Sequence, residues 1–234
     1  MKKIFVIGMG PGHPDYLLPA AKEALKQCDL LAGGARLIES AEAFSAKKVE
    51  TFPLKGELKA WCHQLQEKMQ QNPEGQTGLL LSGDTGCHSL VPVLHRYFDP
   101  NALILVPGIS SIQLFLSHLQ LPWTNGPVIS LHGRRHQWMD VLRHHFFINL
   151  LTDAGSSPDL LAKELLDAGH TEAYMAVGEN LSYKHQRLLL GTPAEIIQQA
   201  PYQMNVVVIS LDATIIKHLQ HRKLAMDSIT RPSR

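Results

Sequence analysis

The chain has 234 residues, of which 44% are hydrophobic and 18% are charged, and its formal net charge is +1. This composition excludes an intrinsically disordered chain, because the apolar residues suffice to bury a core. It also excludes attachment to nucleic acid or to an anionic membrane through a global charge, and leaves only a local basic patch open.

Short apolar runs alternate with longer amphipathic segments in the first half of the chain. We predict strands at residues 3–7, 29–32, 77–81 and 103–106, and helices at residues 20–27, 57–71, 90–97 and 110–119. This alternation predicts a parallel α/β sheet. The first apolar run ends at Gly8, too early for a signal peptide, and no run is long enough to span a membrane. With only three cysteines, we expect a cytoplasmic protein.

A stretch rich in proline and glycine, residues 121–127, interrupts the alternation and predicts a domain boundary. We therefore expect two α/β domains, at residues 1–120 and 121–234. In the second domain we predict strands at residues 128–131, 146–150, 173–177, 187–190 and 206–211, and helices at residues 160–168 and 194–199. The basic tail from His218 is expected to be frayed.

The first candidate site is the loop Gly8-Met9-Gly10-Pro11-Gly12, between a predicted strand and a predicted helix. Glycines at this place let a ligand approach the backbone N–H groups. The spacing differs from the G-x-G-x-x-G pattern of dinucleotide-binding proteins, and Pro11 and Pro14 delay the helix start. This difference disfavours an NAD-dependent oxidoreductase and leaves a plain tight turn open.

Two further loops follow predicted strands, one at residues 82–89 and one at residues 107–111. Asp84 could accept hydrogen bonds from a ligand or cap the next helix, and Ser110 and Ser111 could do either as well. Because the carboxyl ends of parallel strands meet at one edge of a sheet, we expect all three loops to lie together.

The cysteines and histidines do not predict a metal site. Cys28, Cys62 and Cys87 are too far apart for a zinc site or a disulfide framework. Cys87 is next to His88, but neighbours in sequence rarely face each other, so a packed cysteine is favoured over a nucleophile.

The three loops together resemble the tetrapyrrole methylases in order and spacing, and members of that family transfer a methyl group from S-adenosylmethionine. The resemblance covers nearly the whole chain and includes Glu179-Asn180-Leu181 and residues 191–196. It implies two α/β domains with the cofactor in the cleft between them, and a homodimer. The chain departs from the family pattern at Leu18, where a threonine is usual, and at Thr85, where a proline is common.

Three further features resemble the family members that methylate carbon 5 of a cobalamin precursor, precorrin-6Y or cobalt-precorrin-7. They are Gly33-Gly34 followed by Arg36, then Leu121-Pro122-Trp123, and then residues 130–134. The implied substrate is a corrinoid with many carboxylates, and the guanidinium fork matches a carboxylate with two hydrogen bonds. The substrate-binding residues that we expect are Arg36, His132, Arg134 and Arg135.

The resemblance also implies a set of residues for S-adenosylmethionine. From the first half they are Gly8, Gly10, Pro11, Gly83, Asp84, Cys87, Ser110 and Ser111, and from the second half Leu151, Thr152, Met204 and Asn205. Methyl transfer from a sulfonium to carbon is an in-line displacement, so we expect catalysis by proximity and alignment, without a catalytic side chain or a metal.

Three alternatives to this function stay open at the level of the sequence. They are a family member with another substrate, the NAD-dependent oxidoreductase, and a tetrapyrrole carrier without catalysis. The chain ends at Arg234, shortly after its last predicted strand. We therefore expect a stand-alone carbon-5 enzyme, with the decarboxylating carbon-15 methyltransferase as a separate pathway partner.

Overall fold

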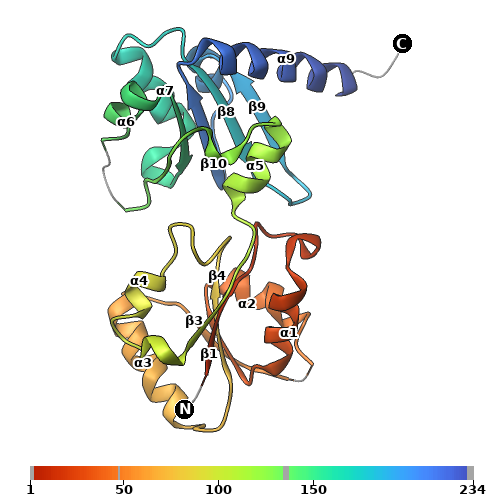
Figure 1. Ribbon diagram of the computed structural model, residues 1–234, viewed down its shortest axis with the longest axis vertical. Helices are drawn as coiled ribbons and strands as arrows, with labels where there is room; N and C mark the ends of the chain where they lie inside the picture. Colours follow the sequence, from red (N-terminus) through yellow and green to blue (C-terminus); the bar gives the residue numbers. More distant parts are fainter. Residues whose placement is uncertain (1–2, 47, 134–136, 231–234) are drawn as a thin grey trace. The chain divides into compact units, whose positions relative to one another are not determined.

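The computed structural model describes residues 3–46, 48–133 and 137–230, and it divides into two compact units, Met1–Ser110 and Ser111–Arg234 (Figure 1). Each unit contains a five-stranded sheet, which confirms the expected α/β class. The division comes earlier in the chain than residues 121–127, because helix α5 (Ser111–Leu119) packs against strands of the second sheet. None of the described helices is long and apolar enough to cross a membrane.

The first unit is built around an all-parallel sheet with the strand order β3-β2-β4-β1-β5. The strands are β1 (Ile4–Gly8), β2 (Leu30–Gly33), β3 (Glu50–Pro53), β4 (Thr77–Leu81) and β5 (Leu103–Val106). The helices are α1 (Pro19–Gln27), α2 (Ala35–Glu42), α3 (Leu58–Gln70) and α4 (Val91–Leu94), with short 3-10 turns at Pro14–Tyr16 and Pro100–Ala102.

Helices cover both faces of this sheet, with α1 and α2 on one face and α3 and α4 on the other (Figure 1). Alternate residues of β1 therefore enter different cores: Ile7 packs in the core of α1 and α2, and Val6 in the core of α3 and α4. Both side chains are fully buried. This two-sided burial explains why the central strands are continuous apolar runs in the sequence.

The second unit contains a mixed sheet with the strand order β6-β7-β10-β8-β9, in which β6 and β7 are parallel and the other pairs antiparallel. The strands are β6 (Val128–Ser130), β7 (Phe147–Leu151), β8 (Tyr174–Glu179), β9 (Arg187–Gly191) and β10 (Asn205–Ser210). Besides α5, the helices are α6 (Trp138–His145), α7 (Pro158–Asp167), α8 (Pro193–Ile197) and α9 (Ala213–Thr230), with 3-10 turns at Trp123–Asn125 and Ala154–Ser156.

The C-terminal region differs from the expected frayed tail, because helix α9 continues through Thr230. Its Leu219 is fully buried, and two of its polar side chains reach the end of α5. His218 Nε2 lies 2.8 Å from the carbonyl oxygen of Leu119, and the guanidinium of Arg222 donates to the carbonyl of His118 at 2.9 Å. These carbonyls have no partner inside their own helix, so α9 caps α5 and is held in place by it.

Candidate functional site

The three glycine-containing loops lie together at the carboxyl edge of the first sheet, as expected from the sequence. Strands β4, β1 and β5 are neighbours and parallel, so their following loops meet. The N–H of Met9 donates to the carbonyl of Leu81 at 2.8 Å. Gly10 and Gly83 exchange two backbone hydrogen bonds, of 3.1 and 3.0 Å, which join the first loop to the second.

Three glycines at this edge are packed so closely that no side chain fits between them. A Cβ atom on Gly8 would lie 2.7 Å from the nitrogen of Gly108. A Cβ atom on Gly108 would lie 2.2 Å from the carbonyl oxygen of Gly83. Both distances are far below van der Waals contact, so the three loops meet here backbone against backbone, and only glycine fits at these positions.

Asp84 joins the second loop to the third, which neither interpretation from the sequence had anticipated. Its Oδ2 accepts a hydrogen bond from the N–H of Gly108 at 2.9 Å, and its Oδ1 accepts one from the N–H of Gly86 at 2.8 Å. At the N-terminal end of α4 it is instead Ser89 whose Oγ accepts a hydrogen bond, from the N–H of Val91 at 3.2 Å. Each carboxylate oxygen keeps a further lone pair, so Asp84 can still accept a hydrogen bond from a ligand.

Cys87 and Ser110 bring the second and third loops together a second time. The Ser110 hydroxyl donates to Cys87 Sγ at 3.7 Å, and Ser110 is buried while Cys87 is partly exposed. Among the described residues, no three histidine, cysteine or acidic side chains are grouped so that they could hold a metal ion. Pro11 is buried beside these loops, and Ser111 begins helix α5.

The predicted site residues of the second unit also share one edge of their sheet. Strands β6 and β7 end at this edge, and the antiparallel β10 begins there. The hydroxyl of Thr152 lies 2.9 Å from the carbonyl oxygen of Asn205 and 2.7 Å from its Oδ1. The N–H of Leu131 donates to the carbonyl of Leu151 at 2.8 Å. Thr152 and Asn205 are therefore joined directly, and the loop after β6 lies beside them.

Asp153 fixes the loop that contains His132. Its Oδ2 accepts a hydrogen bond from the N–H of Gly133 at 3.0 Å. This hydrogen bond, followed by those from Ser156 and Gly155, holds the pKa of Asp153 below its ordinary value, and the charge of His132 acts in the same direction. His132 itself is exposed, and its Nδ1 lies 3.3 Å from the hydroxyl of Ser130.

The remaining substrate candidates are distributed over both units. Arg36 is exposed in the first turn of α2, directly after β2, at the same edge of the first sheet as the glycine loops. Arg134 and Arg135 lie outside the described residues. Leu18, where the family usually has a threonine, occupies the N-cap position of α1, and this N-cap forms no side-chain hydrogen bond.

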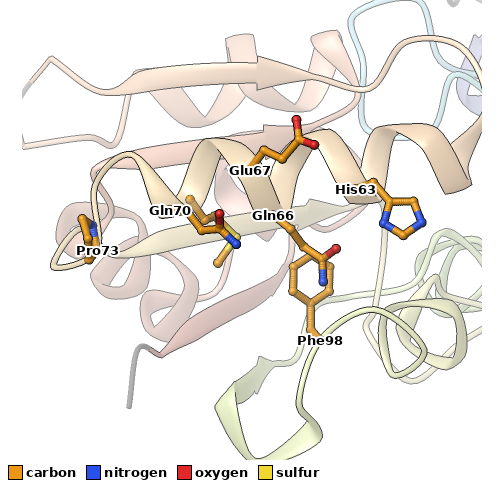
Figure 2. A pocket seen from close by; sticks show the side chains of 7 residues that line it. His63, Gln66, Glu67, Gln70, Pro73 and Phe98 are labelled. Carbon is orange, nitrogen blue, oxygen red and sulfur yellow. The ribbon is translucent and has the colours of Figure 1, made fainter.

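The structure also contains a cavity of about 550 Å³ that the sequence did not suggest (Figure 2). It runs along α3 and is lined by His63, Gln66, Glu67, Met69, Gln70, Pro73 and Phe98. Gln66 donates to the carbonyl of Tyr97, and the His63 ring packs edge-on against the Tyr97 ring at 5.3 Å. These contacts hold α3 against the segment that follows α4. None of the predicted site residues lines the cavity.

Most of the chain matches one known protein family. The sequence profile of the tetrapyrrole (corrin/porphyrin) methylases matches residues 3–197. The chain belongs to the tetrapyrrole methylase family. The matched range includes every glycine loop at the first edge and the end of β8 at the second, which confirms the resemblance seen in the sequence.

This methylase is similar over most of its length to curated relatives. It is 30% identical over 204 residues to the cobalt-precorrin-7 C(5)-methyltransferase of Salmonella typhimurium, covering 87% of this chain and 96% of the relative. It is 28% identical over 199 residues to a probable cobalt-precorrin-7 C(5)-methyltransferase of Methanocaldococcus jannaschii, covering 82% and 90%.

Solved structures confirm the fold of this methylase. The precorrin-6Y methylase of Archaeoglobus fulgidus has a TM-score of 0.68 at 18% identity, covering 90% of this chain and 99% of that one. A uroporphyrin-III C-methyl transferase of Thermus thermophilus, solved with S-adenosyl homocysteine, has a TM-score of 0.73 at 16% identity, covering 92% and 99%.

Proposed function

We propose that this methylase transfers the methyl group of S-adenosylmethionine to carbon 5 of a corrinoid precursor, cobalt-precorrin-7 or precorrin-6Y, in cobalamin biosynthesis. The observation that carries the proposal is the match to the Salmonella carbon-5 enzyme over 87% of this chain and 96% of that enzyme. Residues 130–133, part of the segment that resembles the carbon-5 enzymes, lie at the same edge as Thr152 and Asn205.

The glycine edge of the first unit fits a cofactor that is held largely by backbone groups. S-adenosylmethionine supplies an electrophilic methyl group on a sulfonium sulfur. The chain's part is to hold the cofactor and substrate in line and to exclude water, which can contribute roughly 7–11 kcal/mol to a displacement. We propose that the cofactor contacts are Gly8, Gly10, Pro11, Gly83, Asp84, Cys87, Ser110 and Ser111, completed by Leu151, Thr152, Met204 and Asn205.

The substrate carboxylates require fixed cationic partners, and we assign these to Arg36, His132, Arg134 and Arg135. Lysine keeps the charge of arginine and loses its two-pronged geometry. Arg134→Lys should therefore lower turnover of the macrocycle while S-adenosylhomocysteine binds as in the wild type. Unchanged turnover in both Arg134→Lys and Arg134→Ala would remove Arg134 from the substrate site.

The proposal extends to assembly and to the pathway partner. We propose a cytoplasmic homodimer that works with a separate decarboxylating carbon-15 methyltransferase. This chain matches 49% of the length of a Sinorhizobium protein named precorrin-6Y C(5,15)-methyltransferase [decarboxylating], at 25% identity. Light scattering tests the dimer, and release of carbon dioxide by the isolated protein would contradict the separate partner.

Mass spectrometry of a corrinoid intermediate incubated with the protein and S-adenosylmethionine tests the function. We expect the corrinoid to gain one methyl group without losing carbon dioxide. Methylation of uroporphyrinogen III instead would identify a family member with another substrate, and binding of the corrinoid without transfer would identify a carrier. Calorimetry with NAD should show no binding, whereas S-adenosylhomocysteine should bind.

A further inference from the structure

Glu179, the last residue of β8, places a carboxylate inside the second unit. Its side chain is only 2% exposed, and a buried carboxylate is costly unless both oxygens have partners. Oε1 accepts a hydrogen bond from the backbone N–H of Gln203 at 2.6 Å. Oε2 forms an ion pair with Arg187, with its Nε at 2.9 Å, but accepts no hydrogen bond among the described residues. The carboxylate thus connects the end of β8 with β9 and with the segment that leads into β10.

Residues 199–203, which lead into β10, are also held by Arg187 and by the hydroxyl of Tyr202, which belongs to the segment. The guanidinium of Arg187 donates to the carbonyl of Gln199 at 3.3 Å and stands over the ring of Tyr202, 5.9 Å from its centre. The Tyr202 hydroxyl donates to the carbonyl of Ile196 at 2.6 Å. Burial raises the pKa of Tyr202 to about 12, so this hydroxyl remains a donor at neutral pH.

The segment fixed by these contacts leads directly into Met204 and Asn205, the two residues that we assigned to the cofactor. The N–H of Asn180 donates to the carbonyl of Met204 at 2.8 Å, and the amide of Asn180 donates to Gln203 Oε1 at 2.7 Å. Asn205 meets the hydroxyl of Thr152. The backbone is therefore fixed on both sides of Met204, while the Met204 side chain remains 49% exposed.

We propose that Glu179 is a positioning residue that sets the backbone of Gln203, and through it presents Met204 and Asn205 to the cofactor. This role rests on the proposed function, because it assumes that S-adenosylmethionine contacts those two residues. The hydrogen bond from Gln203 carries the role, and the ion pair with Arg187 compensates the buried charge. Glu179 itself does not touch the reacting atoms.

Two conservative variants separate this role from a purely structural charge. Glu179→Gln keeps an oxygen that can accept from Gln203 and loses the ion pair. Glu179→Asp keeps the charge, but its side chain is one methylene shorter and draws back from Gln203. We expect S-adenosylhomocysteine to bind Glu179→Gln within about threefold of the wild type, and Glu179→Asp about tenfold or more weakly, as for loss of a hydrogen bond to a charged group.

A control variant and two further measurements distinguish a local effect at this edge from a general loss of stability. Leu165→Ala removes a fully buried core side chain of the same unit, from the last turn of α7, and should lower the melting temperature with unchanged affinity. Hydrogen exchange should accelerate at residues 203–205 in Glu179→Asp and remain as in the wild type in Leu165→Ala. The KM for S-adenosylmethionine should rise in Glu179→Asp while the KM for the corrinoid stays the same.

The outcomes distinguish this inference from the function on which it rests. Wild-type affinity in Glu179→Asp, or weak binding in Glu179→Gln with normal binding in Glu179→Asp, would overturn the positioning role alone. Equal loss of affinity in Glu179→Asp and Leu165→Ala would show that Glu179 affects binding only through the stability of the fold. Failure of the wild type to bind S-adenosylhomocysteine would refute the proposed function, and the cofactor role of Glu179 with it.

Discussion

The two sheet edges that carry the predicted site residues are built in different ways. At the edge of the first sheet, Gly8, Gly83 and Gly108 bring backbone against backbone without any side chain between them. At the edge of the second sheet, the hydroxyl of Thr152 reaches the first residue of β10, Asn205, and the carboxylate of Glu179 reaches Gln203 in the segment before β10. The first edge should therefore be most sensitive to an added side-chain atom, and the second to the loss of a side-chain group.

The largest expected effect is that of Gly108→Ala. The new methyl group would lie 2.2 Å from the carbonyl oxygen of Gly83, so the two loops must separate. We expect binding of S-adenosylhomocysteine to be lost, with about 1–3 kcal/mol of stability lost by overpacking. Gly34→Ala is the matched control, because Gly34 has a φ of −60° and nothing within 4 Å of an added Cβ. Calorimetry and urea unfolding of both variants check this, and tight binding by Gly108→Ala would contradict it.

Asp84→Ala should have the next largest effect, because Asp84 is the side chain that connects two loops of the backbone-built edge. Removing it leaves the part-buried N–H of Gly108 without its acceptor, at about 1.5–3 kcal/mol for a hydrogen bond to a charged group, whereas water can replace the acceptor of the exposed N–H of Gly86. Stability and cofactor affinity should therefore fall together.

Asp99→Ala is the control for Asp84, since Asp99 accepts from the N–H of Asn101 at 2.9 Å in an exposed turn of the same unit. Its loss should cost about 1 kcal/mol of stability and no affinity. Melting curves with and without S-adenosylhomocysteine separate the two variants. A ligand-induced shift in Asp84→Ala equal to that of the wild type would show that the loop connection is not needed for binding.

Thr152→Val tests the side-chain-built edge with a smaller change. Valine fills nearly the same volume and removes the hydroxyl that reaches Asn205, so we expect a loss of about 1 kcal/mol and severalfold weaker cofactor binding. Thr77→Val is the control, because the buried Thr77 hydroxyl has no hydrogen-bond partner among the described residues. Urea unfolding should find Thr77→Val as stable as the wild type or more so, and equal losses in both variants would refute the comparison.

The smallest expected effect is the pH dependence contributed by Asp153. Its pKa is held below the ordinary value of 3.8, chiefly by the N–H of Gly133. A lowered carboxyl pKa contributes stability above pH 3.8, and that contribution is lost as the pH falls through the folded-state pKa. Asp153→Asn should therefore lose stability less steeply on acidification below pH 3.8. The free energy of unfolding, measured against pH for both proteins, checks this, and an identical fall with decreasing pH would contradict it.

The backbone-built edge was readable from the sequence because its signals are local. Thr77–Leu81 and Leu103–Val106 have the predicted bounds, since each is an apolar run stopped by a turn with glycine. The same signal placed the loops after them at one edge. Strand β3 (Glu50–Pro53) was missed, because it lies at the sheet margin and has no fully buried residue. Helix α2 was missed because Gly33-Gly34 indicated a loop.

The side-chain-built edge depends on partners that are distant in sequence. Thr152 and Asn205 are separated by 53 positions, and nothing local marks them as a pair. Glu179 stands in a segment that resembles the family and follows an apolar run, but neither signal names its partners Gln203 and Arg187. The same limit explains why α9 was expected to be a frayed tail. Its basic residues are typical of a solvated segment, and the sequence does not show that His218 and Arg222 contact the carbonyls at the end of α5.

A crystal structure with bound S-adenosylhomocysteine tests most directly the claim that these two edges hold the cofactor. We expect the ligand to contact backbone groups of the loops at Gly10, Gly83 and Ser110, together with Thr152 and Asn205. A ligand bound away from the glycine loops, for instance in the cavity along α3, would contradict the account.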